Sequence, residues 1–230
     1  MPETPEKLVG TRLLPIFPLP LVLLPYELLP LHIFEPRYRR MLTDITAADR
    51  LFGVNHIDPE ESERPEPGSI GCAAAVHDIQ PMPDGRSNIV TTGLTRYQLV
   101  GFVETDSPYL IAEVEFFEDV AHSEFGIAEL ANQAVALFDR VARAAHEISG
   151  GHGKLPDLPR SEPEALSFLI SAAFSLEPAE KLRMLEMRST RERLERLREI
   201  LVAAVEKIEP SAEIHRISKS NGHSKKKVDY

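Results

Sequence analysis

One histidine–glutamate pair matches the start of a zinc-binding helix motif. His146 and Glu147 fit the first two positions of His-Glu-x-x-His, in which two histidines four residues apart lie on one helix face and share the metal. The next histidine is His152, and Gly150 and Gly151 interrupt the helix before it. A spacing of six residues places the second histidine on another face of a helix. We therefore expect no metal site here.

The chain also lacks a phosphate-binding loop. That loop needs Gly-x-x-x-x-Gly-Lys-Ser/Thr, and the only Gly-Lys pair, at 153–154, has neither the leading glycine nor the following hydroxyl residue. We therefore expect no catalytic residue, no cofactor and no enzymatic activity. One enzymatic alternative remains open, a small-ligand pocket in which His32, Glu35 and Arg96 converge in the fold.

A charged and aromatic cluster, Glu35, Arg37 and Tyr38, is the most prominent polar candidate for function. Its structural explanation is that Glu35 favours the positive start of a helix, while Arg37 pairs with a carboxylate. Its functional explanation is that this corner lines a recognition surface together with Arg96 and Tyr97 from a later strand. The sequence leaves both explanations open.

Residues 13–34 form a long apolar run that contains five prolines. About 20 apolar residues suffice to span a bilayer, but each proline inside a helix costs about 3 kcal/mol. We therefore expect short edge strands and turns instead of a membrane helix. Core packing explains most large side chains, but an exposed apolar patch would mark a binding site for extended polypeptide. The candidate contact residues of this segment are Leu21, Leu23, Tyr26, Leu28 and Phe34.

Composition restricts the class of protein and its partners. The chain has 230 residues, of which 43% are hydrophobic, enough for one substantial core or two small ones. Its net charge of -10 argues against nucleic acid as the main partner, because phosphate binding favours a basic face. Cys72 is the only cysteine, which fits a reducing compartment. The first residues lack the pattern of a signal peptide, so we expect a cytoplasmic protein without membrane contact.

The first half of the chain carries strand signals around one helix. In residues 110–117 the apolar and charged residues alternate, which predicts one buried and one wet face. Asp84-Gly85 lies between two strand-like runs and predicts a hairpin. Pro36 suits a helix start. We expect strands at 50–57, 69–79, 89–103 and 109–117, and a buried helix stripe of Tyr38, Met41, Leu42 and Ile45.

After about residue 121 the apolar spacing becomes helical. Two helix starts carry a serine followed three residues later by a glutamate, the capping-box pattern. We expect helices at 127–148, from Ser161 to about 174, at 177–187 and from Ser189 to about 208. The predicted fold class is α+β, with a flexible tail at 1–10, a β subdomain at 11–120, an α-helical subdomain at 121–210 and a disordered polar tail at 211–230.

Several motifs along the chain occur in the same order in one known family. They are Leu-Pro-Ile-Phe-Pro-Leu-Pro at 14–20, Leu-Pro-Leu-His-Ile-Phe-Glu-Pro-Arg-Tyr at 29–38, Phe-Gly-Val at 52–54, Asp-Gly-Arg at 84–86, Gly-Leu-Thr-Arg-Tyr at 93–97 and Tyr-Leu-Ile-Ala-Glu-Val-Glu at 109–115. Together they resemble the N-terminal domain of Lon proteases, and most closely the stand-alone bacterial proteins that consist of that domain. The chain departs from this family at Tyr26, where relatives often carry glycine after the proline. Because tyrosine tolerates a positive φ poorly, we expect a type I turn at Pro25-Tyr26.

The resemblance implies a PUA-like β-barrel followed by a helical bundle, whereas periodicity alone indicates a β part followed by an α part. It also implies substrate recognition without the ATPase and peptidase domains of a full Lon protease. We therefore expect a non-catalytic module that binds polypeptide, either unfolded segments or a partner protein, in recognition or as an adaptor. Because PUA-like barrels elsewhere bind RNA, an RNA-binding protein is the alternative, and the acidic charge counts against it.

Overall fold

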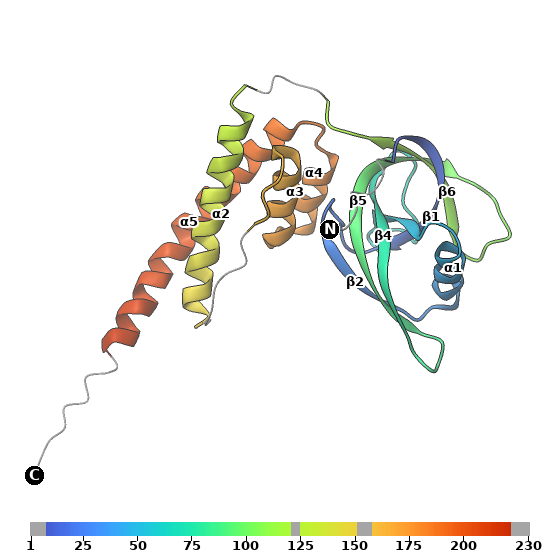
Figure 1. Cartoon of the computed structure of the whole chain (residues 1–230), viewed down its shortest axis with the longest axis horizontal. Coiled ribbons are helices and arrows are strands. Elements are labelled where there is room, and N and C mark those ends of the chain that lie inside the picture. The colour runs from blue at the N-terminus through green and yellow to red at the C-terminus, as the bar shows by residue number, and fades with distance from the viewer. Residues whose placement is uncertain (1–7, 121–124, 151–157, 222–230) are drawn as a thin grey trace, which may run out of the picture. The chain divides into compact units, whose positions relative to one another are not determined.

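The computed structural model describes residues 8–120, 125–150 and 158–221, with side chains described up to residue 216. The chain divides into two compact units, unit 1 with the strands and unit 2 with the long helices (Figure 1). Unit 1 comprises Met1–Ala121 and Ser171–Ser189, and unit 2 comprises His122–Ile170 and Thr190–Tyr230. The α+β class predicted from the sequence is confirmed.

Unit 1 is built on one six-stranded sheet in the order β2-β5-β4-β3-β1-β6. Because β5 pairs with both β4 and β6, five of the strands close into a ring, and β2 lies outside it on the edge of β5. This closure removes the exposed edges of the five strands in the ring. The strands are β1 (Gly10–Leu19), β2 (Leu28–Ile33), β3 (Leu51–His56), β4 (Ile70–Pro81), β5 (Ser87–Phe102) and β6 (Leu110–Phe117).

Strand β5 changes its neighbour halfway along its length. Residues 87–92 pair with β2, and residues 96–102 pair with β6. Between them, at Gly93, the pairing of β5 with β4 also shifts register. Between these two partners, the edge of β5 that faces β2 and β6 has no neighbouring strand near Gly93. The turn before β2 occupies this position and bonds to Gly93.

The barrel interior is organised around Tyr97, which is fully buried. Its hydroxyl donates a hydrogen bond of 2.5 Å to Oδ1 of Asn55. Two glycines make room for the ring, since a Cβ added at Gly53 would lie 2.3 Å from the hydroxyl and one at Gly71 would lie 2.5 Å from it. A large polar side chain thus fills the core with its single hydroxyl satisfied, as burial requires.

The apolar run near the N-terminus forms strands and turns, as predicted, but only β2 is an edge strand, because β1 pairs with both β3 and β6. It supplies β1, the turn before β2, and β2 itself. No helix among the described residues is long and apolar enough to cross a membrane.

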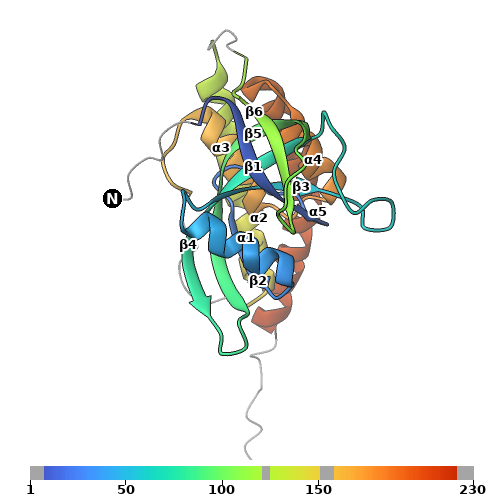
Figure 2. The ribbon, with the colours of Figure 1, turned by 90° about the vertical axis from the view of Figure 1, so that its right-hand side faces the viewer.

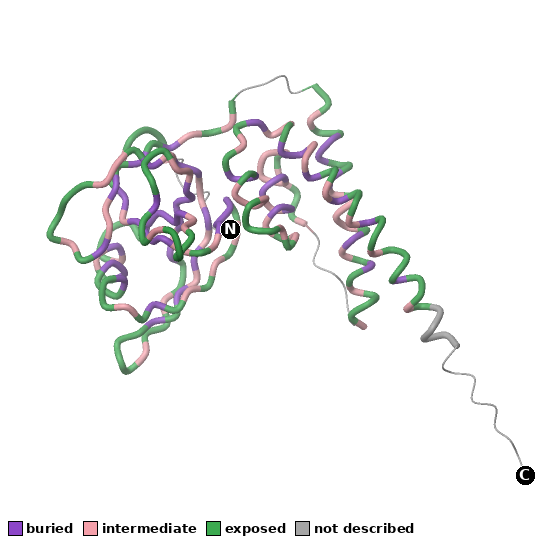
Figure 3. Tube along the Cα trace, turned by 180° about the vertical axis from the view of Figure 1, so that it is seen from behind, coloured by how far each residue is buried: buried purple, intermediate pink, exposed green. Residues whose placement is uncertain are grey.

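The first helix and the hairpin also agree with the prediction. Helix α1 (Pro36–Thr46) begins at its proline and buries Tyr38, Met41, Leu42 and Ile45, the four residues of the expected stripe. Each such side chain contributes about 1.5–3 kcal/mol on full burial. The β4–β5 hairpin turns at Gly85, where φ is +81°. It extends away from the body of the sheet (Figure 2), and its tip is exposed (Figure 3).

Unit 2 is helical. Helices α2 (Ile127–Ile148) and α5 (Thr190–Asn221) lie side by side (Figure 1), and α3 (Pro163–Ala173) begins in this unit. Arg193 of α5 is fully buried, donates to the hydroxyl of Ser167 at 2.7 Å and lies 4.0 Å over the ring of Phe168. The helical core therefore contains a charged group that the apolar spacing alone does not predict.

Helix α4 (Pro178–Glu186) falls at the predicted position but groups with unit 1 instead of the helical unit. Lys181 on this helix forms an ion pair of 2.6 Å with Glu27, which lies just before β2. The predicted boundary at residue 121 therefore separates the strands from most helices but misplaces α4. Local periodicity identifies a helix, but it does not reveal which partner the helix packs against.

Two local predictions in the helical half are wrong. Ser161 does not open α3, because the helix begins at Pro163 and the hydroxyl of Ser161 is directed to the carbonyl of Pro159. The expected disordered tail from residue 211 is helical as far as Asn221, with Pro210 inside α5. Ala212 is buried there, and Arg216 pairs with Glu213 one turn away. These polar residues have the spacing of helical ion pairs, which supports a helix.

Candidate functional site

The turn that leads into β2 contains a strained residue. Tyr26 has a φ of +67°, and the amide of Glu27 donates to the carbonyl of Leu24 at 3.2 Å. A positive φ at the third position of a hydrogen-bonded turn is the mark of type II, so the expected type I turn at Pro25-Tyr26 is wrong. For a residue with a Cβ this conformation costs about 1–2 kcal/mol. The surrounding contacts must therefore hold it in place.

Those contacts come from Gly93 and Lys181. The amide of Tyr26 donates to the carbonyl of Gly93 at 2.8 Å, and the amide of Gly93 donates to the backbone carbonyl of Glu27 at 2.9 Å. A Cβ on Gly93 would lie 2.1 Å from the carbonyl oxygen of Leu24, so only glycine lets the turn approach β5 this closely. The Glu27 carboxylate accepts from the amide of Leu24 and from Lys181, at 2.9 and 2.6 Å. The turn is thus fixed to both β5 and α4.

Three large apolar side chains between this turn and the residue after β2 are exposed. Tyr26, Leu28 and Phe34 have exposed fractions of 49%, 66% and 57%, and we call them the Tyr26 surface. The ring of His32 stacks on Phe34 at 6.0 Å and is hydrogen-bonded to Asn88 at 2.7 Å. The stretch of chain from the turn to the end of β2 therefore presents apolar groups to solvent.

Two other candidates of this segment are less accessible. Leu23 is 1% exposed and belongs to the core, and Leu21 is only partly exposed. Leu23 is therefore not available to a partner, in contrast to its place among the sequence candidates. Both residues lie in a run of apolar residues without period, and such a run does not separate buried from exposed positions.

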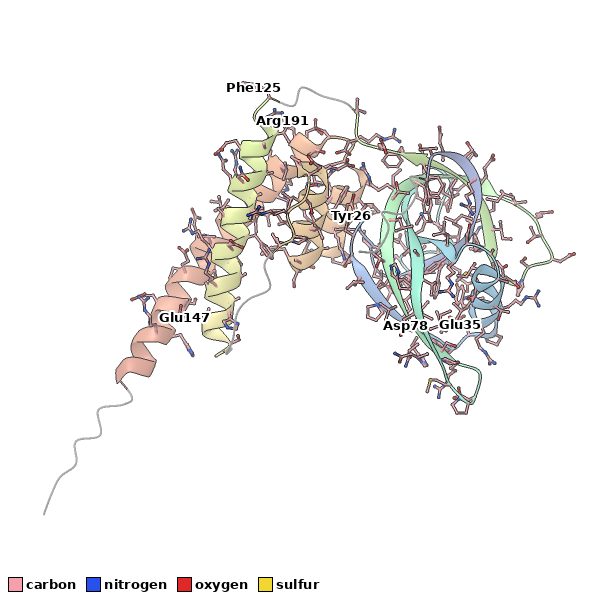
Figure 4. All side chains as sticks on the ribbon, viewed as in Figure 1. Tyr26, Glu35, Asp78, Phe125, Glu147 and Arg191 are labelled. Atoms are coloured by element: carbon pink, nitrogen blue, oxygen red, sulfur yellow. The ribbon has the colours of Figure 1, made fainter. Side chains whose placement is uncertain are left out.

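The Glu35 corner is separate from the Tyr26 turn, and Figure 4 shows Tyr26 and Glu35 well apart on unit 1. Glu35 accepts a hydrogen bond of 2.9 Å from Arg37, whose guanidinium lies 4.6 Å over the ring of Tyr38. Tyr38 itself is buried and packs on Phe17 with 4.0 Å between ring centres. Burial raises the pKa of the Tyr38 hydroxyl above its usual 10.0. The structural explanation thus accounts for the contacts of this corner.

Arg96 and Tyr97 do not line a surface with that corner. Arg96 is 2% exposed, and it donates to the carboxylate of Asp119 at 2.5 Å and to the carbonyls of Leu185 and Met187. Tyr97 points into the barrel, as described above. The proposed recognition surface of Glu35 and Arg37 with Arg96 and Tyr97 is therefore wrong, because the strand buries both of the later residues.

The single cysteine is inert. Cys72 is fully buried between strands, and burial raises the pKa of its thiol well above the usual value. The thiolate is the reactive form, so this residue acts as a small core side chain. Among the described residues no group of three or more His, Cys, Asp or Glu side chains could hold a metal ion.

Sequence reasoning missed the residues that hold the site. Glu27, Gly93, Lys181 and Asp119 were not among the candidates, although each fixes the turn or the helix beside it. One signal was available, since Glu27 is the only carboxylate within the apolar run 13–34. A lone carboxylate in such a run requires a partner, because burying an unpaired charge is costly.

Comparison with known families agrees with this architecture. A family model described as the ATP-dependent protease La (LON) substrate-binding domain matches residues 13–203. The match covers most of the chain, and the protein belongs to this family.

Curated relatives are longer than this chain. Lon protease 1 of Herpetosiphon aurantiacus is 26% identical over 190 residues, which is 77% of this chain and 22% of the relative. Lon protease 2 of the same organism is 24% identical over 200 residues, which is 85% of this chain and 24% of the relative. The chain thus spans about a quarter of the length of the curated relatives it matches.

Solved structures show the same fold. A Lon N-terminal domain protein from Xanthomonas campestris superposes with a TM-score of 0.58 at 22% identity, covering 81% of this chain and 96% of the other. The N-terminal domain of Mycobacterium avium complex Lon protease gives a TM-score of 0.60 at 19% identity, covering 85% of this chain and 99% of the other. At these identities the likeness concerns the fold.

Proposed function

We propose that this protein binds extended polypeptide, either unfolded segments or a segment of a partner protein, at the Tyr26 surface. The observation that carries the proposal is the exposure of three large apolar side chains within nine residues of chain. Large apolar side chains exposed along one stretch of chain, about 20 Å from Leu28 to Phe34 at ~3.3 Å per residue, suit contact with an extended segment. Membership of a substrate-binding-domain family supports the same role.

The strained turn adds a second support. A tyrosine in the left-handed region persists only where neighbouring contacts hold it, and such outliers concentrate at functional sites. Here the hydrogen bonds to Gly93 and the Glu27–Lys181 pair hold the backbone, while the Tyr26 ring remains half exposed. Tyrosine is a frequent binding hot spot because its large ring loses little conformational freedom.

The edge of β2 favours recognition by side chains over recognition by main-chain pairing. In the described sheet β2 pairs only with β5, so its second edge has no neighbouring strand. Pro30 in the middle of β2 has no N–H to offer an added strand. A bound polypeptide would therefore contact apolar side chains with limited sequence preference, as suits a binder of unfolded segments.

The test is binding of a labelled globular protein that is kept unfolded by reduction and carboxymethylation, followed by fluorescence anisotropy. The double variant Tyr26→Asp/Leu28→Asp should bind about tenfold more weakly or worse, since two desolvated contacts become charged. The matched control is Phe125→Asp/Ile214→Asp, which changes two exposed apolar residues of unit 2. Equal affinity of the wild-type protein and the Tyr26/Leu28 variant, with the fold intact by circular dichroism, would remove the proposal.

We also propose that the module is not catalytic and acts in the cytoplasm as a recognition or adaptor component. The same labelled polypeptide gives the test of catalysis, since it should remain full length on a gel after long incubation with the protein. Fragments that appear with the wild-type protein and persist through further purification would contradict the proposal.

A further inference from the structure

A second site lies on unit 1 at the end of β2 remote from the Tyr26 turn, close to Phe34. A pocket of about 440 Å³ is lined by residues of α1 and of the β4–β5 hairpin. It shares no lining residue with the Tyr26 surface, and its polar groups include Arg39, Arg40, Thr43 and Ser87. The pocket therefore differs from the proposed polypeptide site in its chemistry, although Phe34 of that site lies two residues before Pro36.

Arg39 is the cationic group of this pocket without a counter-ion. Its guanidinium makes no hydrogen bond or ion pair with any residue that the structure describes, whereas the nearby arginines of α1 and of the hairpin each have an acidic partner. Those pairs are Arg37–Glu35, Arg40–Asp44 and Arg86–Asp84. One full positive charge thus faces the pocket uncompensated.

The hairpin turn lies directly beside this exposed charge. A Cβ added at Gly85 would lie 1.9 Å from Nη2 of Arg39 and 2.8 Å from its Cζ, so the guanidinium rests directly against the turn backbone. The positive φ of Gly85 is what turns this bare backbone toward α1. A guanidinium that already lies against a neighbouring element loses less side-chain freedom when it binds a ligand.

Further donors line the same pocket. Ser87 is buried, and its hydroxyl has no hydrogen-bond partner in the described part of the chain. Arg40 uses its Nε–H for Asp44 at 2.9 Å, and its two terminal nitrogens bond to no described residue. Guanidinium N–H groups and a hydroxyl together match the acceptors of a tetrahedral oxyanion.

We propose that this pocket binds a phosphate-type oxyanion, either free or as the end group of a larger molecule. Arg39 supplies the charge, and Ser87 and Arg40 supply additional hydrogen bonds. The protein as a whole carries a net charge of -10 and so repels anions at long range. Binding of an anion at this pocket must therefore come from the local arrangement of donors.

The test follows the Arg39 Nε–H and the Gly85 N–H by nuclear magnetic resonance during titration with inorganic phosphate. Ionic strength is held constant with chloride, because exposed charges are screened by salt. We expect saturable shifts of both signals, with a dissociation constant on the order of millimolar. A parallel titration with phenyl phosphate distinguishes the sources, since tighter binding of the ester indicates an end group and tighter binding of inorganic phosphate indicates the free ion.

Three variants make the result specific. Arg39→Gln should weaken phosphate binding about tenfold or abolish it, and Gly85→Ala should weaken it by displacing the guanidinium. Arg198→Gln is the matched control, because Arg198 is an exposed helical arginine without a partner in the described residues. Absence of saturable shifts, or equal binding by the Arg39 and Arg198 variants, would overturn the proposal. Neither result depends on polypeptide binding at the Tyr26 surface.

Discussion

The guanidinium of Arg96 and the carboxylate of Asp119 form a hydrogen-bonded ion pair of 2.5 Å in which both side chains are largely shielded from water. The same arginine donates to the carbonyls of Leu185 and Met187 at the end of α4. One buried cation therefore connects β5, the segment after β6 and the helix that carries Lys181. Such a pair is costly to break, because the partner left behind stays charged and buried.

Replacement of Asp119 by alanine should lower the free energy of unfolding by about 3–5 kcal/mol, the usual cost of leaving one partner of a buried pair. Urea unfolding followed by circular dichroism measures the loss. The double variant Arg96→Met/Asp119→Leu is the control, and it should be more stable than Asp119→Ala because no uncompensated charge remains. A loss below about 1 kcal/mol for Asp119→Ala would show that the pair behaves like an exposed one.

The left-handed conformation of Tyr26 leads to an unusual expectation for stability. Tyr26→Gly should leave the free energy of unfolding unchanged to within about 1 kcal/mol, because relief of the strain offsets the greater freedom of glycine in the unfolded chain. Tyr26→Val should lower it by about 1–3 kcal/mol, since a β-branched residue resists a positive φ. Thermal unfolding of the two variants makes the comparison. Equal losses for both would mean that φ at this position carries no cost.

The hydroxyl of Tyr97 makes stability depend on pH in the alkaline range. Burial raises its pKa well above 10.0, so the unfolded chain releases this proton at a lower pH than the folded protein does. The stabilisation is complete below about pH 10 and declines as the pH rises further. Tyr97→Phe should lower the free energy of unfolding by about 1–3 kcal/mol at pH 7, because the buried Asn55 oxygen loses its donor.

Urea unfolding at pH 7 and at about pH 10.5 tests this linkage. The difference in free energy of unfolding between the wild-type protein and Tyr97→Phe should be smaller at the higher pH, because the wild-type protein there loses the contribution of Tyr97. Burial also raises the pKa of Tyr38 and Tyr109, so some decline remains in the variant. Parallel declines in both proteins would assign the alkaline effect to those other groups.

The glycines beside the Tyr97 ring should not accept a side chain. A Cβ at Gly71 would lie 2.5 Å from the ring and 2.8 Å from the carbonyl oxygen of Val54, so Gly71→Ala should cost about 1–3 kcal/mol by overpacking. Gly101→Ala is the matched control in β5, because a Cβ there meets nothing within 4 Å. Differential scanning calorimetry should show a lower melting temperature for the first variant only. Similar melting temperatures for both variants would show that the barrel core accommodates the added methyl group without loss of stability.

Local features of this fold could be predicted from the sequence, but its long-range contacts could not. The helix stripe behind Pro36 and the turn at Asp84-Gly85 depend on neighbouring residues, and both predictions are confirmed. The burial of Arg96 depends on Asp119 and on α4, which lie far along the chain. Leu23 and Leu28 belong to one apolar run, yet the first is buried and the second exposed because only the tertiary fold distinguishes them.

In the candidate site, too, the residue types could be predicted from the sequence but the backbone conformation could not. Tyr26, Leu28 and Phe34 could be selected as apolar residues of a proline-broken run, and the structure leaves all three exposed. The positive φ of Tyr26 could not be selected, because residue type favours the opposite conformation there. It arises from the hydrogen bonds to Gly93, a residue that is distant in sequence.

Closure of the ring also determines when the first strand can be completed during synthesis. Strand β1 pairs on one edge with β3 and on the other with β6, so that Gly10 lies opposite Phe116. A ribosome adds about 5–20 residues each second, and β1 therefore waits several seconds with one edge unpaired. An apolar strand in that state is prone to join another nascent chain. The order of the strands thus leaves one edge of β1 open to misassociation until β6 has been synthesised.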